Sequence, residues 1–259
     1  MLPKGIADKF EDEIDKKLDT KSKHKIFNGF QNNKTINEVL DKTTIMTLYD
    51  LINKHIISYV NGVVRSGKES QLFWAVDKNG KDIALKIYLV STSSFKKRTS
   101  YILGDPRFSE VRKGTRNLVY LWAKKEFRNL IQCVEHNIPS TKPIYVTKNI
   151  LVMEFVGKNG VPEKTLVEAE VSQKDYELTI SLIKRLYKEA KLVHGDLSEF
   201  NIFKTETGLI LFDLASGVDI QHPNAQEFLK RDINNISKFF VKRGLTVVNP
   251  DDIFDLVTK

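Results

Sequence analysis

Two stretches decide how this chain folds: the polar HGDLSEFN at residues 194–201 and the mostly apolar LILFDLA at residues 209–215. Together they fit the pattern H-x-D-L-x-x-x-N, followed by an aspartate at the end of an apolar strand. Phosphoryl transfer uses such a set, in which Asp196 would accept or orient the activated hydroxyl and Asn201 and Asp213 would hold Mg²⁺. Mg²⁺ prefers oxygen ligands and takes few of them from the protein. A loop that merely caps strands would not need four such residues at fixed spacing, so we expect a catalytic and metal site here.

A strand lysine paired with a helical glutamate should accompany this set. Lys86 lies in IALKIY at residues 83–88, where alternation places Ala84 and Lys86 on one face of a strand. Ala84 would then line the adenine. Glu126, in a helical pattern forty residues later, is the best partner for Lys86, and Glu110 and Glu135 are weaker alternatives. Without the later motif, the lysine would be an exposed strand residue and Glu126 a solvated helix charge.

A phosphate-binding turn is expected between the first two strands. The candidate ATP-binding residues there are Ser66, Gly67, Lys68, Glu69 and Ser70. Backbone amides and short polar side chains in such a turn can cradle phosphate. The turn lacks the three glycines of ordinary protein kinases. It nearly matches the Walker pattern through Gly62, Gly67 and Lys68, but Glu69 stands where a magnesium-binding hydroxyl is required. A carboxylate would repel phosphates there, so we expect no P-loop NTPase.

The remaining pattern predicts an α+β protein. Runs rich in β-branched and aromatic residues predict strands over 58–65, 71–77, 82–89 and 149–156, and two more around Gly208. An Asn79-Gly80 pair predicts a hairpin turn. Periodicity predicts helices over 6–18, 43–55, 111–136, 172–190 and 225–242, and a short tail helix. Ser172 and Asp175 have the spacing of a helix-start capping box.

We expect two lobes with an N-terminal helical extension. The extension would cover 1–57, a strand-rich N-terminal lobe 58–156 with a polar, mobile loop at about 91–109, and a truncated helical C-terminal lobe 157–259. The single cysteine, Cys133, has no disulfide partner in the chain. No apolar run approaches the ~20 residues of a membrane helix, and the polar N-terminus does not look like a secretory signal. We therefore expect a cytoplasmic protein without a membrane partner.

Positive charge is concentrated in one part of the chain. The net charge is +8, and residues 81–130 alone hold 12 Lys and Arg against 4 Asp and Glu. The densest part, residues 96–116, contains seven basic residues: Lys96, Lys97, Arg98, Arg107, Arg112, Lys113 and Arg116. A local field of this kind attracts RNA and other phosphate-rich partners, although a solvated charged surface is the simpler alternative.

In order along the chain, SGKES, IALKIY, HGDLSEFN and LFDLA resemble the RIO family of atypical serine protein kinases. The segments STSSFKKR, YILGDPRF and WAKKEFRNL are similar to its first subfamily, and the short chain is similar to archaeal members. The resemblance implies a bilobal protein-kinase-like fold whose C-terminal lobe is truncated. In agreement with this, DLA replaces DFG, no A-P-E signature follows, and little chain remains after Asp213.

The resemblance also implies a function and further site residues. Family members bind ATP with Mg²⁺ (Mn²⁺ is an alternative), phosphorylate serine, including their own, and act on the small ribosomal subunit precursor and its RNA. Asp213 would also accept a phosphate, which implies an ATPase-like cycle. Met153 would lie at the back of the adenine pocket, and backbone groups of Glu154 and Val156 would meet the adenine edge.

Two other classes of function stay open from the sequence. A nucleotide-gated ribosome assembly factor would depend on ATP binding more than on phosphoryl transfer, and missing peptide-binding helices favour it. Retention of Lys86, Asp196, Asn201 and Asp213 argues against an inactive kinase. A protein that only binds RNA through its basic residues would not need HGDLSEFN.

The basic stretch gives a testable prediction. Because each neutralised phosphate releases counterions, log affinity falls with log salt with a slope of roughly −0.7 to −0.9 per phosphate contact. Reversing three of the seven charges should flatten that slope by about two to three units, with basal ATP hydrolysis little changed. The measurement is binding to a small-subunit ribosomal RNA fragment across a salt series. An unchanged slope would favour the simpler solvated surface.

Overall fold

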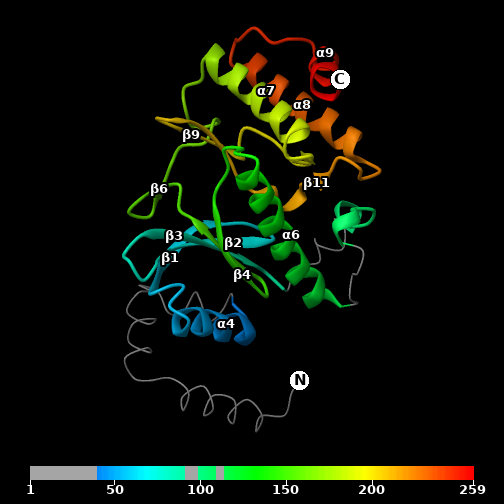
Figure 1. Cartoon of the computed structure of the whole chain (residues 1–259). Coiled ribbons are helices and arrows are strands. Elements are labelled where there is room, and N and C mark those ends of the chain that lie inside the picture. Colours follow the sequence, from blue (N-terminus) through cyan, green and yellow to red (C-terminus); the bar gives the residue numbers. More distant parts are fainter. Residues whose placement is uncertain (1–39, 91–98, 109–113) are drawn as a thin grey trace.

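The structure is a computed structural model that describes residues 40–90, 99–108 and 114–259. A strand-rich lobe and a helical lobe lie one above the other, with a long helix running alongside both (Figure 1). This arrangement confirms the expected α+β, bilobal class. The helix predicted over 6–18, and with it most of the proposed extension, lies outside the described residues.

The first lobe is built on one antiparallel sheet of five strands in the order β1-β2-β3-β5-β4. The strands are β1 Tyr59–Ser66, β2 Ser70–Val76, β3 Asp82–Tyr88, β4 Pro143–Thr147 and β5 Ile150–Glu154. The predicted hairpin joins β2 to β3. Its Gly80 has a φ of +81°, and the Asp77 carboxylate accepts the backbone N–H of Asn79 at 2.7 Å and of Lys81 at 2.9 Å.

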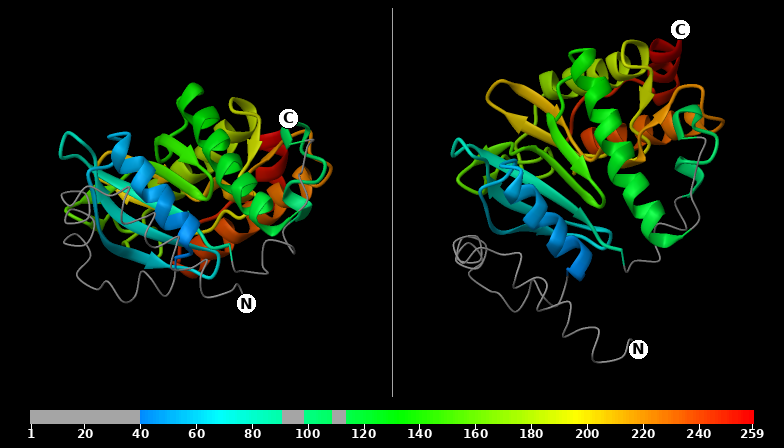
Figure 2. Two further views of the ribbon diagram at one scale, coloured as in Figure 1. Left: turned by 90° about the horizontal axis from the view of Figure 1, so that it is seen from below. Right: turned by 60° about the horizontal axis from the view of Figure 1, so that its bottom comes forward.

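The two faces of β3 bury different residues, as its alternation predicts. Ile83, Leu85 and Ile87 pack into an apolar cluster with helix α4 (Lys42–Asn53), which covers the outer face of the sheet (Figure 2). Ala84 faces the other way and packs with residues of the second lobe. Because Lys86 is two residues from Ala84, its side chain also points to the second lobe.

Helix α6 (Thr115–Glu135) connects the lobes. It packs on β4 and β5 and also reaches η3 (Leu214–Ser216), the turn that follows Asp213. The described part of the expected polar loop is packed rather than extended into solvent. It forms two 3₁₀ turns, η1 (Thr99–Tyr101) and η2 (Pro106–Phe108), and Ile102 and Phe108 are buried against Trp122 of α6. These apolar side chains account for the packing.

The second lobe is mainly helical. Its elements are β6 Gly157–Lys158, β7 Val161–Pro162, α7 Gln173–Lys188, β8 Leu192–Val193, β9 Ile202–Thr205, β10 Gly208–Leu211, β11 Val218–Asp219, α8 Ala225–Lys242 and α9 Pro250–Thr258. The capping box of α7 is confirmed, since Ser172 and Asp175 exchange hydrogen bonds. α8 has the bounds that periodicity predicts. The sequence did not predict β4, which begins at a proline, or the two-residue strands β6, β7, β8 and β11.

The β6–β7 hairpin, which lies where the chain passes between the lobes, is fastened to the sheet. Asp82 accepts hydrogen bonds from the Trp74 indole and from the backbone of Asn159, both at 2.8 Å. Gly160 has a φ of +77°, and a Cβ atom there would lie 2.4 Å from the Trp74 ring. Only glycine therefore fits at the tip of this hairpin.

Gly160→Ala should destabilise the fold more than the matched variant Gly80→Ala. Both residues have positive φ, which costs an alanine about 1–2 kcal/mol, but a Cβ at Gly80 meets nothing within 4 Å. Overpacking against Trp74 should add about 1–3 kcal/mol. Urea unfolding measures both changes. Equal losses in the two variants would show that the hairpin does not press on Trp74.

Candidate active site

The β9–β10 hairpin brings Asn201 and Asp213 to the same edge. Asn201 precedes β9 and Asp213 follows β10, and the two strands pair antiparallel with Ile202 opposite Leu211. The backbone N–H of Phe212 donates to the Asn201 carbonyl at 3.1 Å. The Asn201 side-chain NH₂ donates to the Asp196 carbonyl at 2.7 Å. The amide oxygen of Asn201 is therefore the end that a cation could use.

Helix α8 holds the backbone around Asp196. The Asp232 carboxylate accepts the N–H of Gly195 at 2.7 Å and of Leu197 at 2.9 Å, and Arg231 donates to the Gly195 carbonyl. Burial raises the pKa of Asp232 to about 7, although the two N–H donors oppose the shift. The side chain of Asp196 is itself exposed. The sequence analysis did not identify Arg231 and Asp232. No local pattern indicates that these residues contact a loop more than thirty positions earlier in the chain.

His194 ties this loop to the end of β10. Its Nε2 lies 3.1 Å from the Phe212 carbonyl. Burial lowers the pKa of His194, an effect that the Phe212 carbonyl and the nearby Asp213 oppose. A neutral imidazole with its proton on Nε2 fits these contacts, because a carbonyl can only accept. His194 thus connects the loop that carries Asp196 to Phe212, the residue before Asp213.

Lys86 lies between two carboxylates. Its Nζ is 2.9 Å from Glu126 Oε1, 2.8 Å from Glu126 Oε2 and 2.6 Å from Asp213 Oδ1. The partner predicted for Lys86 is therefore the one observed. Of its rivals, Glu135 is exposed at the end of α6, and Glu110 lies outside the described residues.

The charges of this group depend on one another. Burial alone lowers the pKa of Lys86, but the carboxylates of Asp213 and Glu126 outweigh it, so the pKa is raised and the lysine is charged. Burial raises the pKa of Glu126, and Lys86 opposes that shift. The Tyr88 hydroxyl donates to Glu126 Oε2, and burial next to Glu126 raises the pKa of this tyrosine.

The side chain of Asp213 is partly exposed to solvent, and its backbone conformation is unusual. Its side chain is 47% exposed, whereas that of Glu126 is fully buried. Its backbone is left-handed, with φ 59° and ψ 54°, which is uncommon for a residue other than glycine. Such a conformation persists only where the surroundings impose it.

The predicted phosphate-binding turn, residues 66–70, lies at the end of the sheet where β3 ends at Tyr88. The Gly67 N–H donates to the Ser70 carbonyl at 2.9 Å, and the Leu89 N–H donates to the Glu69 carbonyl at 2.8 Å. Ser66, Gly67 and Lys68 are exposed, and Glu69 and Ser70 are half-buried. Ser70 pairs with Tyr88, the residue that contacts Glu126, so the turn is joined to the lysine strand.

The predicted adenine-lining residues meet between β3 and β5. Ala84 pairs with Met153, and both are buried. The Glu154 N–H donates to the Lys142 carbonyl at 2.8 Å, and the Val156 carbonyl accepts from Glu163 at 2.9 Å. The Glu154 N–H and the Val156 carbonyl are therefore engaged within the protein, and the other backbone groups of these residues, the Glu154 carbonyl and the Val156 N–H, are the ones that the adenine prediction can use.

The basic stretch does not form one surface in the part that is described. Arg107 is directed inward, with Asp105 at 2.7 Å and its side chain 19% exposed. Arg116 pairs with Asp41 at 2.9 Å. Including Arg107 in a docking surface was therefore wrong, because Asp105 and α6 already satisfy its guanidinium. Lys96, Lys97, Arg98, Arg112 and Lys113 lie outside the described residues.

The donor set suits a cation that keeps water ligands. Within the described ranges, no three His, Cys, Asp or Glu side chains gather in a way that could hold a metal ion. Mg²⁺ does not need such a cluster, since it binds through one or two carboxylates together with substrate phosphates. Asp213 and the Asn201 amide oxygen fit that requirement. Separately, none of the helices described here is long and apolar enough to cross a bilayer.

Comparison with known proteins agrees with this site. A family model for the RIO domain matches residues 71–253. The chain is 38% identical over 261 residues to the RIO-type serine/threonine-protein kinase Rio1 of Methanocaldococcus jannaschii, covering 99% of this chain and 88% of that protein. It is 36% identical over 230 residues to the serine/threonine-protein kinase RIO1 of Homo sapiens, covering 86% of this chain and 40% of that protein.

The fold has a solved counterpart. The Rio2 kinase–ADP/Mg²⁺–phosphoaspartate complex from Chaetomium thermophilum has a TM-score of 0.64 and 26% identity to this chain, covering 83% of it and 66% of that chain. The chain spans 40% of the human relative and 45% of the Caenorhabditis elegans RIO1 kinase. The expected resemblance is confirmed by the RIO-domain match and by the archaeal relative that aligns over nearly its whole length: the chain belongs to the RIO family of serine/threonine protein kinases.

Proposed function

We propose that this chain is an ATP- and Mg²⁺-dependent RIO-type serine/threonine protein kinase that also phosphorylates itself. The observation that carries the proposal is the approach of Lys86 Nζ to Asp213 at 2.6 Å, beside a loop that presents Asp196. A charged lysine, a metal-binding carboxylate and a base are the parts that phosphoryl transfer needs. Family membership supports the same reaction.

In this proposal, the two carboxylates have different tasks. Asp196, exposed on a loop anchored to α8, accepts the proton of the serine hydroxyl as the serine oxygen bonds to the γ-phosphorus and the bond from that phosphorus to the leaving ADP oxygen breaks. Asp213 and the Asn201 oxygen hold Mg²⁺, which when bound offsets charge on the β and γ phosphates. Lys86, kept charged by Glu126, contacts the phosphates from the other side.

The nucleotide would lie along the inner face of the sheet. Ala84 and Met153 line the adenine, with the Glu154 carbonyl and Val156 N–H at its edge. The turn over 66–70 covers the phosphates with backbone amides and short side chains. Mn²⁺ could replace Mg²⁺, since both accept carboxylate and amide oxygens.

A phosphoaspartate cycle is the second candidate activity. Only η3 and β11 lie between Asp213 and α8, so this stretch holds no long activation segment of the kind that positions peptides in ordinary kinases. The solved relative was captured with ADP, Mg²⁺ and a phosphoaspartate. Asp213, 47% exposed, is the residue that would accept the phosphoryl group. Hydrolysis of that intermediate would make the chain an ATPase that gates a ribosome assembly step.

The proposed partner is the small ribosomal subunit precursor and its RNA, in the cytoplasm. Support comes from the charge of residues 81–130 and from the family resemblance. Because Arg107 and Arg116 already pair with Asp105 and Asp41, the charge reversals should use Lys96, Lys97 and Arg98.

Two substitutions test the assigned roles. Asp213→Asn should abolish turnover and the Mg²⁺-dependent part of nucleotide affinity, because the metal loses its charged protein ligand. Asp196→Asn should lower turnover by about 10²–10⁴-fold while nucleotide affinity stays near that of the wild type. Radiolabelled ATP with gel and thin-layer readouts follows transfer to protein and release of phosphate together. Calorimetry with ADP, with and without Mg²⁺, measures binding.

The outcomes separate the alternatives. Hydroxylamine-sensitive label on the wild type would favour the phosphoaspartate cycle over serine phosphorylation, because an acyl phosphate reacts with hydroxylamine and phosphoserine does not. Turnover at wild-type level in Asp213→Asn would contradict the whole assignment. A loss of nucleotide affinity without a loss of turnover rate at saturating ATP in Asp196→Asn would show that Asp196 has been given the wrong role.

A further inference from the structure

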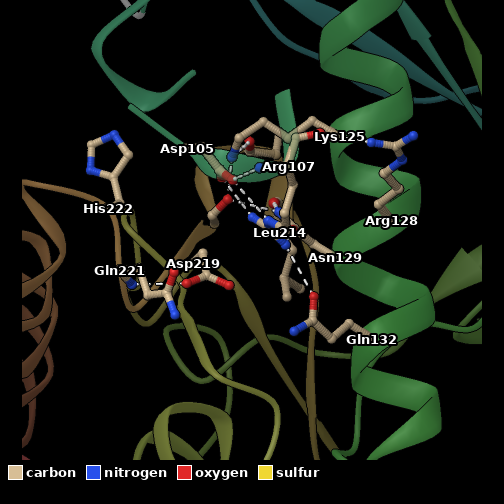
Figure 3. A network of polar contacts seen from close by, with 12 residues as sticks. Asp105, Arg107, Lys125, Arg128, Asn129, Gln132, Leu214, Asp219, Gln221 and His222 are labelled. Carbon is tan, nitrogen blue, oxygen red and sulfur yellow. Dashed lines mark hydrogen bonds and ion pairs between the residues drawn. The ribbon is translucent and has the colours of Figure 1, made fainter. Parts of the chain in front are cut away.

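A buried polar network joins the 99–108 segment to the turn that follows Asp213, and the proposed chemistry does not use it. Its members come from the 99–108 segment, from α6 and from the turn at 214–217, and Figure 3 shows the side chains gathered at one face of α6. Asp105, Lys125 and Asn129 are all buried. Buried polar groups of this kind are costly unless fully paired, so their arrangement requires an explanation.

Arg107 forms the outer end of the network. Its guanidinium meets the Asp105 carboxylate as a two-pronged pair, Nε at 2.9 Å from Oδ1 and Nη2 at 2.7 Å from Oδ2. The remaining nitrogen, Nη1, donates to Asn129 Oδ1 at 2.8 Å and to Gln132 Oε1 at 3.0 Å. A planar guanidinium used on both edges has a fixed orientation.

Arg107 also fixes the orientation of the Asn129 side chain. A guanidinium has only donors, so the oxygen of the amide must face Arg107 and its NH₂ must face the opposite way. That NH₂ donates to the Leu214 carbonyl at 2.7 Å and to the Gly217 carbonyl at 2.9 Å. A flipped amide would place its oxygen against two carbonyls and its NH₂ against the arginine, which makes all three contacts repulsive.

Lys125, one turn earlier on α6, holds the same segment. Its Nζ donates to the Ala215 carbonyl at 3.1 Å and to the Gly217 carbonyl. Burial and the nearby Arg107 lower the pKa of Lys125 to about 7. Asn129 does not titrate, so its contacts to the Leu214 and Gly217 carbonyls do not depend on the charge of Lys125. Together, the two side chains hold the carbonyls of the turn directly after Asp213.

We propose that Arg107 is a positioning residue for Asp213, acting through the oriented amide of Asn129. The left-handed backbone of Asp213 must be imposed by its surroundings, and the turn that Asn129 holds begins at the next residue. The 99–108 segment then supports the proposed metal site indirectly, from outside the catalytic motifs. This inference rests on the proposed function, in which Asp213 holds Mg²⁺.

The test replaces the ion pair without leaving a lone buried charge, using the double variant Asp105→Asn/Arg107→Met. Calorimetry then measures ADP affinity with and without Mg²⁺. The Mg²⁺-dependent gain in affinity should fall about three- to thirtyfold, the range of couplings carried by residues remote from a ligand. Affinity for metal-free ADP should stay unchanged, because the network touches none of the proposed nucleotide-binding residues.

A second variant and a matched control complete the experiment. Asn129→Asp keeps the size and the contact to Arg107 but turns an oxygen toward the two carbonyls, so it should lower the Mg²⁺-dependent gain as well, even if the double variant fails to fold. Arg128→Met is the control, since within the described residues the Arg128 side chain donates to the Arg107 carbonyl at 3.0 Å, stacks over Phe108 and makes no hydrogen bond to Asn129 or to the turn after Asp213. It should keep the wild-type gain.

Three results would overturn the proposal. The Mg²⁺-dependent gain could survive in Asn129→Asp, or it could fall equally in Arg128→Met, which would indicate general loosening of α6. In both of these cases the wild type still gains affinity with Mg²⁺, so the proposed function stands. If the wild type itself gains nothing from Mg²⁺, the proposed function and this inference fail together.

Discussion

One buried ion pair, between Lys86 of β3 and Glu126 of α6, is the constraint on which the site depends. Glu126 is fully buried and its Oε2 lies 2.8 Å from the lysine, so neither charge can be left alone inside the protein without a cost of about 3–5 kcal/mol. The pair therefore fixes α6 against the sheet. Lys86 also contacts Asp213 in the second lobe at 2.6 Å. This second ion pair links the sheet to the second lobe.

Helix α6 extends this constraint beyond the ion pair. Glu126 holds the lysine, while Lys125 and Asn129 hold the turn after Asp213. The lysine and the aspartate are thus fixed from the same helix by different side chains. Helix α8 does the equivalent for Asp196 through Asp232. Helices α6 and α8 thus position Lys86, Asp213 and Asp196, the residues to which the proposed function assigns the chemistry.

The sequence predicted what local pattern can encode. Alternation in β3 correctly predicted that Ala84 and Lys86 share one face, and periodicity correctly predicted the bounds of α8. The motif spacing predicted that Asn201 and Asp213 lie together. The sequence could not predict contacts between distant segments. No residue near Asp232 indicates that its carboxylate holds the backbone on both sides of Asp196. The prediction that Arg107 belongs to a docking surface was wrong for the same reason. The sequence shows its charge but does not show its ion pair with Asp105. Pro143 reads as a break, yet it begins an edge strand, where a missing N–H is tolerated.

The central claim is that Glu126 acts on catalysis through Lys86, and a double-mutant cycle tests it most directly. Mg²⁺-dependent ATP turnover is measured for the wild type, Lys86→Met, Glu126→Gln and the double variant, with unfolding followed in parallel. The account predicts strong coupling: once Lys86 is gone, Glu126→Gln should cost little further turnover. Independent losses that multiply in the double variant would contradict it, because Glu126 would then contribute by a route that does not pass through the lysine.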